Sequence, residues 1–327
     1  DRFRRALKAA PLGRPFIPML RRFGLKELAA MLELAPARLP DPATYDGPGE
    51  ARTEGERRAR VILLAGCAQP VLRPEINDAT IRLLARRGVD VMVANGSGCC
   101  GALVHHMGEE EQALQQARQN VDAWTKEMKK APVDAIIINA SGCGTTVKDY
   151  GYMFRNDSEY AEPAARVSEL TRDVSEFLMD YDLGPPVRWS SLRVAYHSAC
   201  SLQHGQRVTD EPKALLSKAG YTVVSPPEGH ICCGSAGTYN IMQPDLATEL
   251  RTRKVKNIRS VKPDVVAAGN IGCIAQLQSG MDIPIAHTVE LLDWAYGGPV
   301  PHGLEALESY VSDVPKPHPV AKSFLRI

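Results

Sequence analysis

The sequence has no long apolar run, almost no net charge and few aromatic residues. Its 327 residues carry a formal net charge of +1 at pH 7, and aromatic residues make up 6% of them. Balanced charge provides no field that attracts nucleic acid, so we expect no nucleic-acid partner. A membrane-spanning helix needs about 20 consecutive apolar residues, and no stretch approaches that length. The chain starts at Asp1 without a secretory signal, so we expect a cytoplasmic fragment whose N-terminal part is missing.

Motifs for nucleotide binding and for acyl transfer are absent as well. The chain has neither the Gly-x-Gly-x-x-Gly pattern nor the phosphate-loop pattern, and it has no nucleophile elbow. The chain also has no flavin or nicotinamide motif. Eight cysteines in 327 residues are too sparse for a small disulfide-stabilised scaffold. In a reducing compartment, clustered cysteines indicate metal binding or redox chemistry.

All eight cysteines belong to one pattern that occurs twice. Each copy has a single cysteine, a Cys-Cys-Gly after it, and a later lone cysteine. The gap from the single cysteine to the Cys-Cys pair is 32 positions in both copies. A fixed spacing with the same residue types at each cysteine position, called a cysteine station below, indicates a duplicated unit. The two quartets are Cys67, Cys99, Cys100 and Cys143, and Cys200, Cys232, Cys233 and Cys273.

Apolar runs alternate with helical patterns in both copies, which predicts an α/β fold. We expect two duplicated βαβ-type domains with parallel sheets, related by pseudo-two-fold symmetry. Every cysteine station follows the C-terminal end of a predicted strand, and this is the edge of a parallel sheet where ligands bind. The predicted strands are 61–65, 89–94, 135–138, 193–196, 221–225, 265–268 and 283–287, and the predicted helices are 74–87, 109–130, 169–181, 212–219, 246–261 and 288–296.

The domain organisation follows from these elements. We expect a basic N-terminal extension and linker at 1–58, a first domain with its connector at 59–190, a second at 191–297 and an irregular tail at 298–327. The first 26 residues hold eight Lys and Arg and one acidic residue, with short helices at about 2–10 and 25–34. Such a segment either packs back on its own chain or docks on a partner or an anionic membrane surface. The second alternative would place the protein peripherally on the inner membrane.

Adjacent cysteines need a bend in the backbone, because neighbouring strand residues point to opposite faces. Gly101 and Gly234, directly after the two pairs, permit such a bend. Four thiolates suit a [4Fe–4S] cluster or a tetrahedral zinc ion. Adjacent cysteines chelate one zinc ion awkwardly but can bind different irons of a cluster. We therefore favour up to two iron–sulfur clusters, with zinc in one site, a thiol-exchange site, or simply buried thiols as the alternatives.

Several histidines lie beside the cysteine stations. His105, His197 and His230 are candidates to donate hydrogen bonds to cluster sulfurs or to handle protons for a quinone. The alternative is that they are ordinary loop or core residues. His106 and His287 are weaker candidates of the same kind, and we expect surface positions for the remaining histidines, His204, His302 and His318.

The paired Cys…Cys-Cys-Gly…Cys units resemble the cysteine-rich "CCG" domains of heterodisulfide reductase subunits, lactate-utilisation proteins and, in particular, the iron–sulfur subunit of glycolate oxidase. The resemblance rests on 66–70, 98–102, 140–144, 147–151, 232–239, 244–247 and 270–273. It implies an electron-transfer subunit that is not catalytic alone and that holds clusters on all eight cysteines. Its partner would be a flavin-containing 2-hydroxy-acid dehydrogenase subunit, and its acceptor a quinone or another molecule. It also implies a ferredoxin-like segment that this chain lacks.

One departure from the family pattern separates its branches. The relatives that act on heterodisulfides have Cys-x-x-Cys at the last station, whereas this chain has Ala140 and Asn270 at the extra positions. The departure favours the glycolate-oxidase branch. A thiol–disulfide or quinone-reducing module of the heterodisulfide-reductase type remains an alternative, and so does a zinc-stabilised interaction scaffold.

Overall fold

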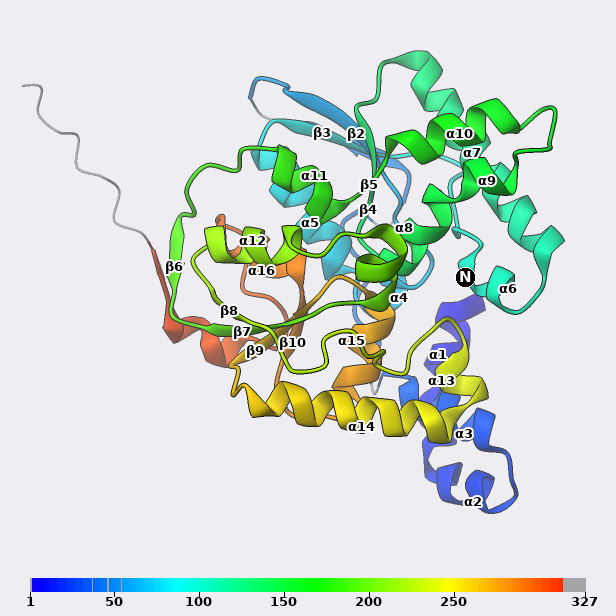
Figure 1. Ribbon diagram of the computed structural model, residues 1–327, viewed down its shortest axis with the longest axis vertical. Coiled ribbons are helices and arrows are strands. Elements are labelled where there is room, and N and C mark those ends of the chain that lie inside the picture. The colour runs from blue at the N-terminus through cyan, green and yellow to red at the C-terminus, as the bar shows by residue number, and fades with distance from the viewer. Residues whose placement is uncertain (1, 37, 46, 54, 314–327) are drawn as a thin grey trace, which may run out of the picture.

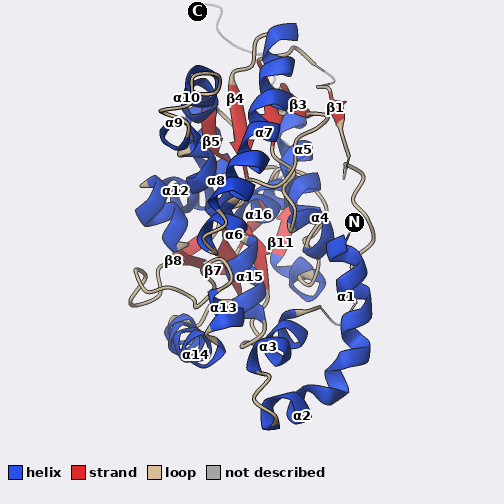
Figure 2. Cartoon of the chain, turned by 90° about the vertical axis from the view of Figure 1, so that its right-hand side faces the viewer, coloured by secondary structure: helices blue, strands red, loops and turns tan. Residues whose placement is uncertain are grey.

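The protein is built from two parallel sheets, each covered by helices on both faces (Figure 1). The computed structural model describes residues 2–36, 38–45, 47–53 and 55–313. The sheets lie one above the other along the long axis of the molecule, as Figure 2 shows. The predicted α/β class with two parallel sheets is confirmed.

The first sheet has the strand order β1-β3-β2-β4-β5. Four of its strands are parallel, and β1 pairs antiparallel with β3 at one edge. All positions of β2 and β4 are buried, as their continuous apolar runs predict for strands covered on both faces. The strands are β1 (Gly49–Ala51), β2 (Ala59–Leu63), β3 (Val89–Val93), β4 (Ala135–Ile138) and β5 (Thr171–Asp173).

The second sheet repeats this topology. Its order is β10-β9-β7-β8, which matches β5-β4-β2-β3 of the first sheet strand for strand, and all of its pairs are parallel. The strands are β7 (Arg193–His197), β8 (Thr222–Val224), β9 (Val265–Ala268) and β10 (Ile285–His287). The cysteine repeat therefore reflects a duplicated unit of structure.

Helices connect the strands in the same order in both units. In the first they are α4 (Gln69–Leu72), α5 (Glu75–Arg86), α6 (Ala102–His106), α7 (Glu110–Lys130), α8 (Ser141–Lys148), α9 (Tyr150–Met153), α10 (Ala161–Leu170) and α11 (Val174–Asp180). In the second they are η2 (Ser201–Gln206), α12 (Glu211–Lys218), α13 (Tyr239–Met242), α14 (Pro244–Ser260), α15 (Ile271–Gln278) and α16 (Thr288–Ala295).

The two units share a core through two related helix pairs. Helix α5 packs against α16, and α11 packs against α12. Because α5 and α12 follow equivalent strands, as do α11 and α16, a two-fold relation between the units requires both pairs. Alternate residues of β2 face different sides: Val61 and Leu63 point into the shared core, and Ile62 points into a separate core under α7 and α10. At the contact of α5 with α16, the buried Asp293 is paired with Arg82 and Arg86.

One predicted helix differs from the structure. Residues 169–181 do not form one helix, because 171–173 pair with β4 as strand β5. The Asp173 carboxylate accepts the Ser175 N–H and Glu176 bonds back to the Asp173 N–H, so this capping box starts a new helix at Val174. The same device, built from His287 and Glu290, starts α16 after β10.

The ends of the chain hold more structure than predicted. The linker at 36–58 contains β1, which extends the first sheet. The tail is not irregular throughout, because η3 (Glu305–Tyr310) leads into β11 (Val311–Asp313), which pairs with β6 (Arg188–Ser190). The rest of the tail, with His318, lies outside the described residues.

The N-terminal extension packs against the second unit. It contains α1 (Arg2–Gly13), η1 (Arg14–Phe16), α2 (Ile17–Arg22) and α3 (Lys26–Leu34). Helix α3 contacts α13 and α14, and Lys26 pairs with Asp245 at the start of α14. The extension therefore packs back on its own chain, while several of its apolar side chains remain exposed, among them Leu12, Phe16 and Phe23. Among the described residues, no helix combines the length and the apolar character needed to cross a bilayer.

Candidate metal centres

The first quartet gathers at the C-terminal edge of the first sheet. Cys67 follows β2, the Cys99–Cys100 pair lies between β3 and α6, and Cys143 is in the first turn of α8. Neighbouring thiols interact, Cys99 with Cys67 and Cys100, and Cys100 with Cys143. Three segments that are far apart in the sequence thus bring four sulfur atoms to one place.

The second quartet has the same arrangement. Cys232 interacts with Cys200 and Cys233, and Cys233 interacts with Cys273 in the first turn of α15. The sulfur atoms of Cys233 and Cys273 and a ring nitrogen of His197 lie within 4.8 Å of one another, and all three residues are buried. The described structure therefore holds two compact groups of thiols, one in each unit.

Gly101 and Gly234 make the bend that brings adjacent cysteines to one site. Their φ angles are +88° and +93°, in the left-handed region that residues with a side chain rarely adopt. A Cβ atom at Gly101 would lie 3.0 Å from the Ala113 carbonyl oxygen, and one at Gly234 would overlap the Ala247 carbonyl. The Gly234 N–H also donates to the Cys232 sulfur at 3.3 Å. Both glycines thus allow the bend and a close approach of the next helix.

The thiols shift one another's pKa values within each quartet. Hydrogen bonds from Cys100 and Cys67 lower the pKa of Cys99, and hydrogen bonds from Cys200 and Cys233 lower the pKa of Cys232. The same contacts raise the pKa of Cys67 and Cys200. The pKa of Cys273 in the second quartet is lowered as well, chiefly by Cys233. A thiolate is the form that binds a metal, so Cys99 in the first quartet, and Cys232 and Cys273 in the second, are prepared as ligands.

The histidine candidates differ in their burial and in their contacts with the cysteines. His197 is buried, and one of its ring nitrogens lies within 4.8 Å of the sulfur atoms of Cys233 and Cys273. Its interaction with Cys273 lowers the pKa of that thiol, after the larger effect of Cys233. His105 and His230 are exposed, and no hydrogen bond joins either to a cysteine in the described chain. His106 lies against Gly237 of the other unit. His287 caps α16 through its Nδ1, which accepts the Val289 N–H, and burial lowers its pKa to about 4.

His204 and His302 are at the surface, as predicted.

Asn270, at the position where heterodisulfide-type relatives have an extra cysteine, caps a helix in this structure. The Asn270 side chain caps α15 by accepting the Gly272 N–H at 3.2 Å. At the equivalent position the buried Ala140 precedes α8, which has no side-chain cap. The helices that carry Cys143 and Cys273 meet at the boundary of the units, where the Ser141 N–H donates to the Gly269 carbonyl at 3.1 Å.

A buried polar network behind Cys67 was not predicted. Asn139, directly after β4, donates to Asn77 at 2.8 Å and to Thr80 at 3.0 Å, and it accepts a hydrogen bond from Gln69 at 2.9 Å. Asn77 in turn donates to the Ala65 carbonyl. The network fixes the chain on both sides of Cys67. Its residues are scattered single amides and hydroxyls with no common spacing, so the sequence carried no signal for it.

Both quartets suit an iron–sulfur cluster better than a single zinc ion. Each supplies four thiols, two of them on adjacent residues, and the helix termini and backbone N–H groups around them favour negative charge. Adjacent cysteines chelate one zinc ion awkwardly but can bind different irons of a cluster.

Comparison with known proteins places the chain in a family. The model of the CCG cysteine-rich domain matches residues 61–148 and 194–278, which include all eight cysteines. The chain belongs to the CCG cysteine-rich domain family. It is 39% identical over 90% of its length to the glycolate oxidase iron–sulfur subunit of Escherichia coli K12, of which it covers 68%.

The chain is also similar to two further relatives. The chain is 30% identical over 79% of its length to a probable glycolate oxidase iron–sulfur subunit of Bacillus subtilis, and it spans 59% of that relative. Lactate utilization protein A of Oceanobacillus iheyensis is 25% identical over 72% of the chain, and 96% of that relative is covered. The predicted family is thereby confirmed.

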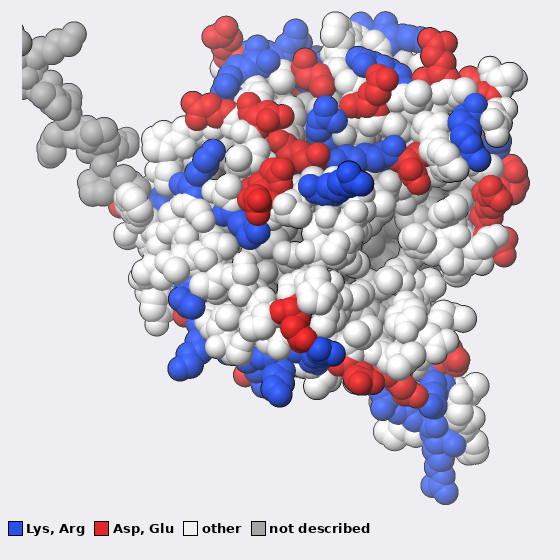
Figure 3. Space-filling model, in the orientation of Figure 1, with Lys and Arg blue, Asp and Glu red and all other residues white. Residues whose placement is uncertain are grey.

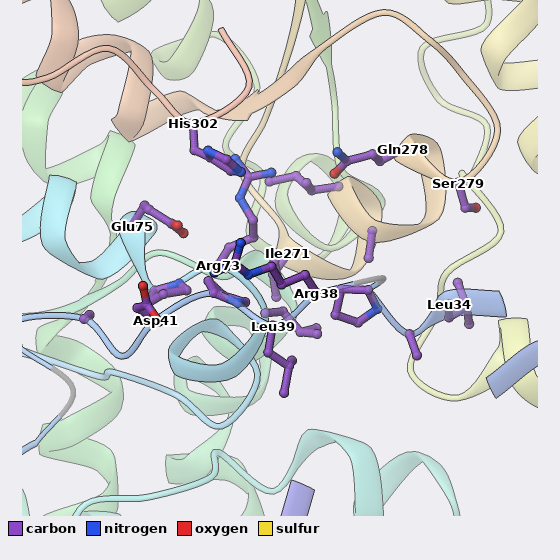
Figure 4. A pocket seen from close by; sticks show the side chains of 18 of the residues that line it. Leu34, Arg38, Leu39, Asp41, Arg73, Glu75, Ile271, Gln278, Ser279 and His302 are labelled. Carbon is purple, nitrogen blue, oxygen red and sulfur yellow. The ribbon is translucent and has the colours of Figure 1, made fainter. Parts of the chain in front are cut away.

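A cleft of about 800 Å³ lies between α15, which carries Cys273, the region of α4 and α5, and the N-terminal extension. Ile271 and Ile274 of its wall flank Cys273 in α15, and Arg73 of its floor follows α4. Figure 4 shows Arg38 and Arg73 between Glu75 and Asp41 on one side and Gln278 on the other. Three buried polar atoms in this region, Arg73 Nε, Glu75 Oε2 and Asp78 Oδ1, have no hydrogen-bond partner within the described chain. Burial raises the pKa of Glu75.

Proposed function

We propose that this chain is the iron–sulfur electron-transfer subunit of a complex that oxidises glycolate or a related 2-hydroxy acid. The observation that carries the proposal is the pair of thiol quartets, one at the C-terminal edge of each sheet. The names of the E. coli and B. subtilis relatives support the substrate. The oxidation itself would take place on a flavin-containing partner subunit, and the chain would pass the electrons to a quinone or another acceptor.

The residues of the chain have defined roles in this proposal. Cys67, Cys99, Cys100 and Cys143 would hold one cluster, and Cys200, Cys232, Cys233 and Cys273 would hold the other. When bound, a [4Fe–4S] cluster supplies reversible one-electron transfer. Gly101 and Gly234 shape the two sites, and backbone N–H groups stabilise the negative charge of the sulfur atoms.

Metal analysis of anaerobically purified protein tests this function. We expect a brown protein with iron and acid-labile sulfide in equal amounts and a paramagnetic signal on reduction. Stoichiometric zinc without a redox-active signal would instead establish the zinc-stabilised scaffold. Turnover of a disulfide by this chain alone would establish the thiol–disulfide module.

For the acceptor, we propose the cleft beside α15. Ile271 and Ile274 line it with apolar surface, and the unpartnered Arg73 Nε–H is available to a carbonyl oxygen. Cys273 lies in the same helix as Ile271 and Ile274. These features suit a ring with carbonyl groups, such as a quinone head group. The exposed apolar side chains of α1 and α2 are the candidate contact with a membrane surface or the partner subunit.

Filling the cleft tests the acceptor site. We expect Ala275→Trp, in the wall of the cleft, to weaken binding of a short-chain quinone by about tenfold or more while the iron content is unchanged. Isothermal titration calorimetry on the complete chain measures the binding. Ala161→Trp, a half-buried position at the start of α10, is the matched control and should bind as the unaltered protein does. Equal affinity in both variants would place the acceptor elsewhere.

A further inference from the structure

The two units carry equivalent residues, which permits a direct comparison of the two sites. Gly101 lies against Ala113 of α7, and Gly234 lies against Ala247 of α14 in the same way. Counting from these two alanines, the residue seven positions later is Asn120 in α7 and Lys254 in α14. Both side chains are buried, with 0% and 1% of their surfaces exposed. Asn120 and Lys254 therefore occupy the same place in the two units.

Asn120 supports the first Cys-Cys pair with a neutral amide. Its Oδ1 accepts the Gly98 N–H at 2.8 Å, and its Nδ2 donates to the Cys99 carbonyl at 2.9 Å. The same Nδ2 donates to the Tyr150 hydroxyl, which donates in turn to the Cys100 carbonyl at 2.8 Å. The amide thus fixes the segment around the pair and adds no charge to it.

Lys254 supports the second pair with an ammonium group. Its Nζ donates to the Glu228 carbonyl at 2.9 Å and to the Gly229 carbonyl at 3.3 Å, and both precede Cys232 on the same loop. It interacts electrostatically with the thiols of the second quartet, Cys232, Cys233 and Cys273. No carboxylate bonds to it in the described chain, because the Glu228 carboxylate is held by Arg253 and Asn257. Burial lowers the pKa of Lys254, while the three thiols and, more weakly, the Glu228 carboxylate favour its charged form. The ammonium group therefore has no directly bonded carboxylate, and its strongest favourable electrostatic interactions are with the quartet.

A second pair of equivalent positions differs in the same sense. His197 and Leu64 each lie three residues before the single cysteine of their unit, and both are buried. In the second unit, a ring nitrogen of His197 lies within 4.8 Å of the Cys233 and Cys273 sulfur atoms. In the first unit, Leu64 packs among apolar side chains and offers no donor. Every difference at these two positions adds positive charge or a hydrogen-bond donor to the second site.

We infer that Lys254 and His197 give the second site the higher reduction potential, so that electrons move from the first quartet to the second. The inference rests on the proposed cluster-binding function. A reduced cluster carries one more negative charge than an oxidised one, and a nearby cation or a hydrogen bond to sulfur stabilises that charge. In each transfer one electron leaves the first site and enters the second, and no proton needs to move.

The same direction of transfer agrees with the position of the cleft. Cys273, whose sulfur lies within 4.8 Å of a ring nitrogen of His197, is in the helix that forms the cleft wall. Solvent has the opposite effect on the two reduction potentials. Cys67 is exposed and Cys273 is buried, and water stabilises the added negative charge of a reduced site, so exposure raises the potential of the first site. Because Lys254 is buried, its charge is screened much less than a surface charge, and we expect it to dominate.

Removal of the charge at Lys254 tests the inference. Lys254→Gln keeps a donor for the loop carbonyls and loses the charge, and Lys254→Arg keeps both. In an anaerobic redox titration followed by paramagnetic resonance, we expect Lys254→Gln to reduce the ratio of reduced to oxidised second site at least tenfold at a fixed potential. For a one-electron couple this is about 59 mV. Lys254→Arg should retain the original potential, and so should Lys256→Gln, which removes an exposed charge from the same helix.

Further variants separate a failure of this inference from a failure of the proposed function. The Cys143→Ser background isolates the signal of the second site, and His197→Leu, which installs the residue of the first unit, should shift that signal in the same direction. Iron-free protein would contradict the proposed function. Two intact clusters whose potentials do not respond to Lys254→Gln or to His197→Leu would overturn this inference alone. If Lys254→Gln does not fold, the His197→Leu titration decides the matter.

Discussion

Replacement of Cys99 or Cys232 by serine is expected to remove the cluster of one unit and leave the other intact. Each quartet is complete within its own unit, and no cysteine is shared between them. Cys99 and Cys232 are the central thiols of their quartets, because each interacts with two others. A serine hydroxyl ionises far less readily than a thiol and is a poor ligand for iron in this setting. Each single variant should therefore retain half of the iron and sulfide.

Iron and sulfide analysis, combined with paramagnetic resonance, measures this effect. The variant Cys99→Ser should keep the signal of the second site, and Cys232→Ser the signal of the first. The double variant should be free of iron and provides the baseline. Loss of all iron in either single variant would contradict two independent sites, and retention of all iron would contradict the assignment of the ligands.

Replacement of Gly234 by alanine is expected to destabilise the second unit strongly. The left-handed φ of +93° costs a residue with a Cβ atom about 1–2 kcal/mol. The new methyl group would also overlap the Ala247 carbonyl, which belongs to the backbone of α14 and cannot rotate away. Overpacking of this kind costs about 1–3 kcal/mol more. We therefore expect the free energy of unfolding to fall by about 2–5 kcal/mol, with loss of the second cluster.

Urea unfolding of the metal-free protein measures the loss of stability, and iron analysis measures the loss of the site. Gly98→Ala is the matched control, because the nearest atom to its new methyl group is Gln119 Nε2 at 3.7 Å and its φ is not positive. Its effect should be within about 0.5 kcal/mol, as for most substitutions without a clash. If Gly234→Ala were as stable as Gly98→Ala, the close approach to α14 would not be essential to the second site.

The predicted strands were right where the pattern was continuous and apolar. The runs at 135–138 and 265–268 are the strands β4 and β9, with the predicted bounds. The prediction was wrong at 171–173, because three residues of strand between two helices give no periodic signal of their own. The pairing of Thr171 with Ile136, distant in sequence, makes this segment a strand. Edge strand β1 was missed for the same reason.

Proximity to a cysteine in the sequence did not predict which histidine lies beside a thiol in the structure. His105, His197 and His230 all lie within five residues of a cysteine station, but only His197 is buried beside a thiol. The others are exposed, since their loop or helix turns away from the site. No sequence pattern identified Lys254 as a residue near the second quartet, because it is 21 positions from Cys233 in a helix with the composition of a charged surface helix. Its role follows from the packing of α14 against the Cys-Cys-Gly bend.

By itself, the sequence determined the duplication, the membership of the two quartets, the strand ends that hold them and the need for Gly101 and Gly234. These features depend on local pattern and on spacing, which a single chain displays directly. The tertiary structure decided which polar side chains support each quartet, which histidine reaches a sulfur, and that Asn270 caps a helix where some relatives have a cysteine. Those outcomes depend on contacts between residues distant in the sequence. The difference in charge between Asn120 and Lys254 becomes meaningful only when the fold places both behind equivalent cysteines.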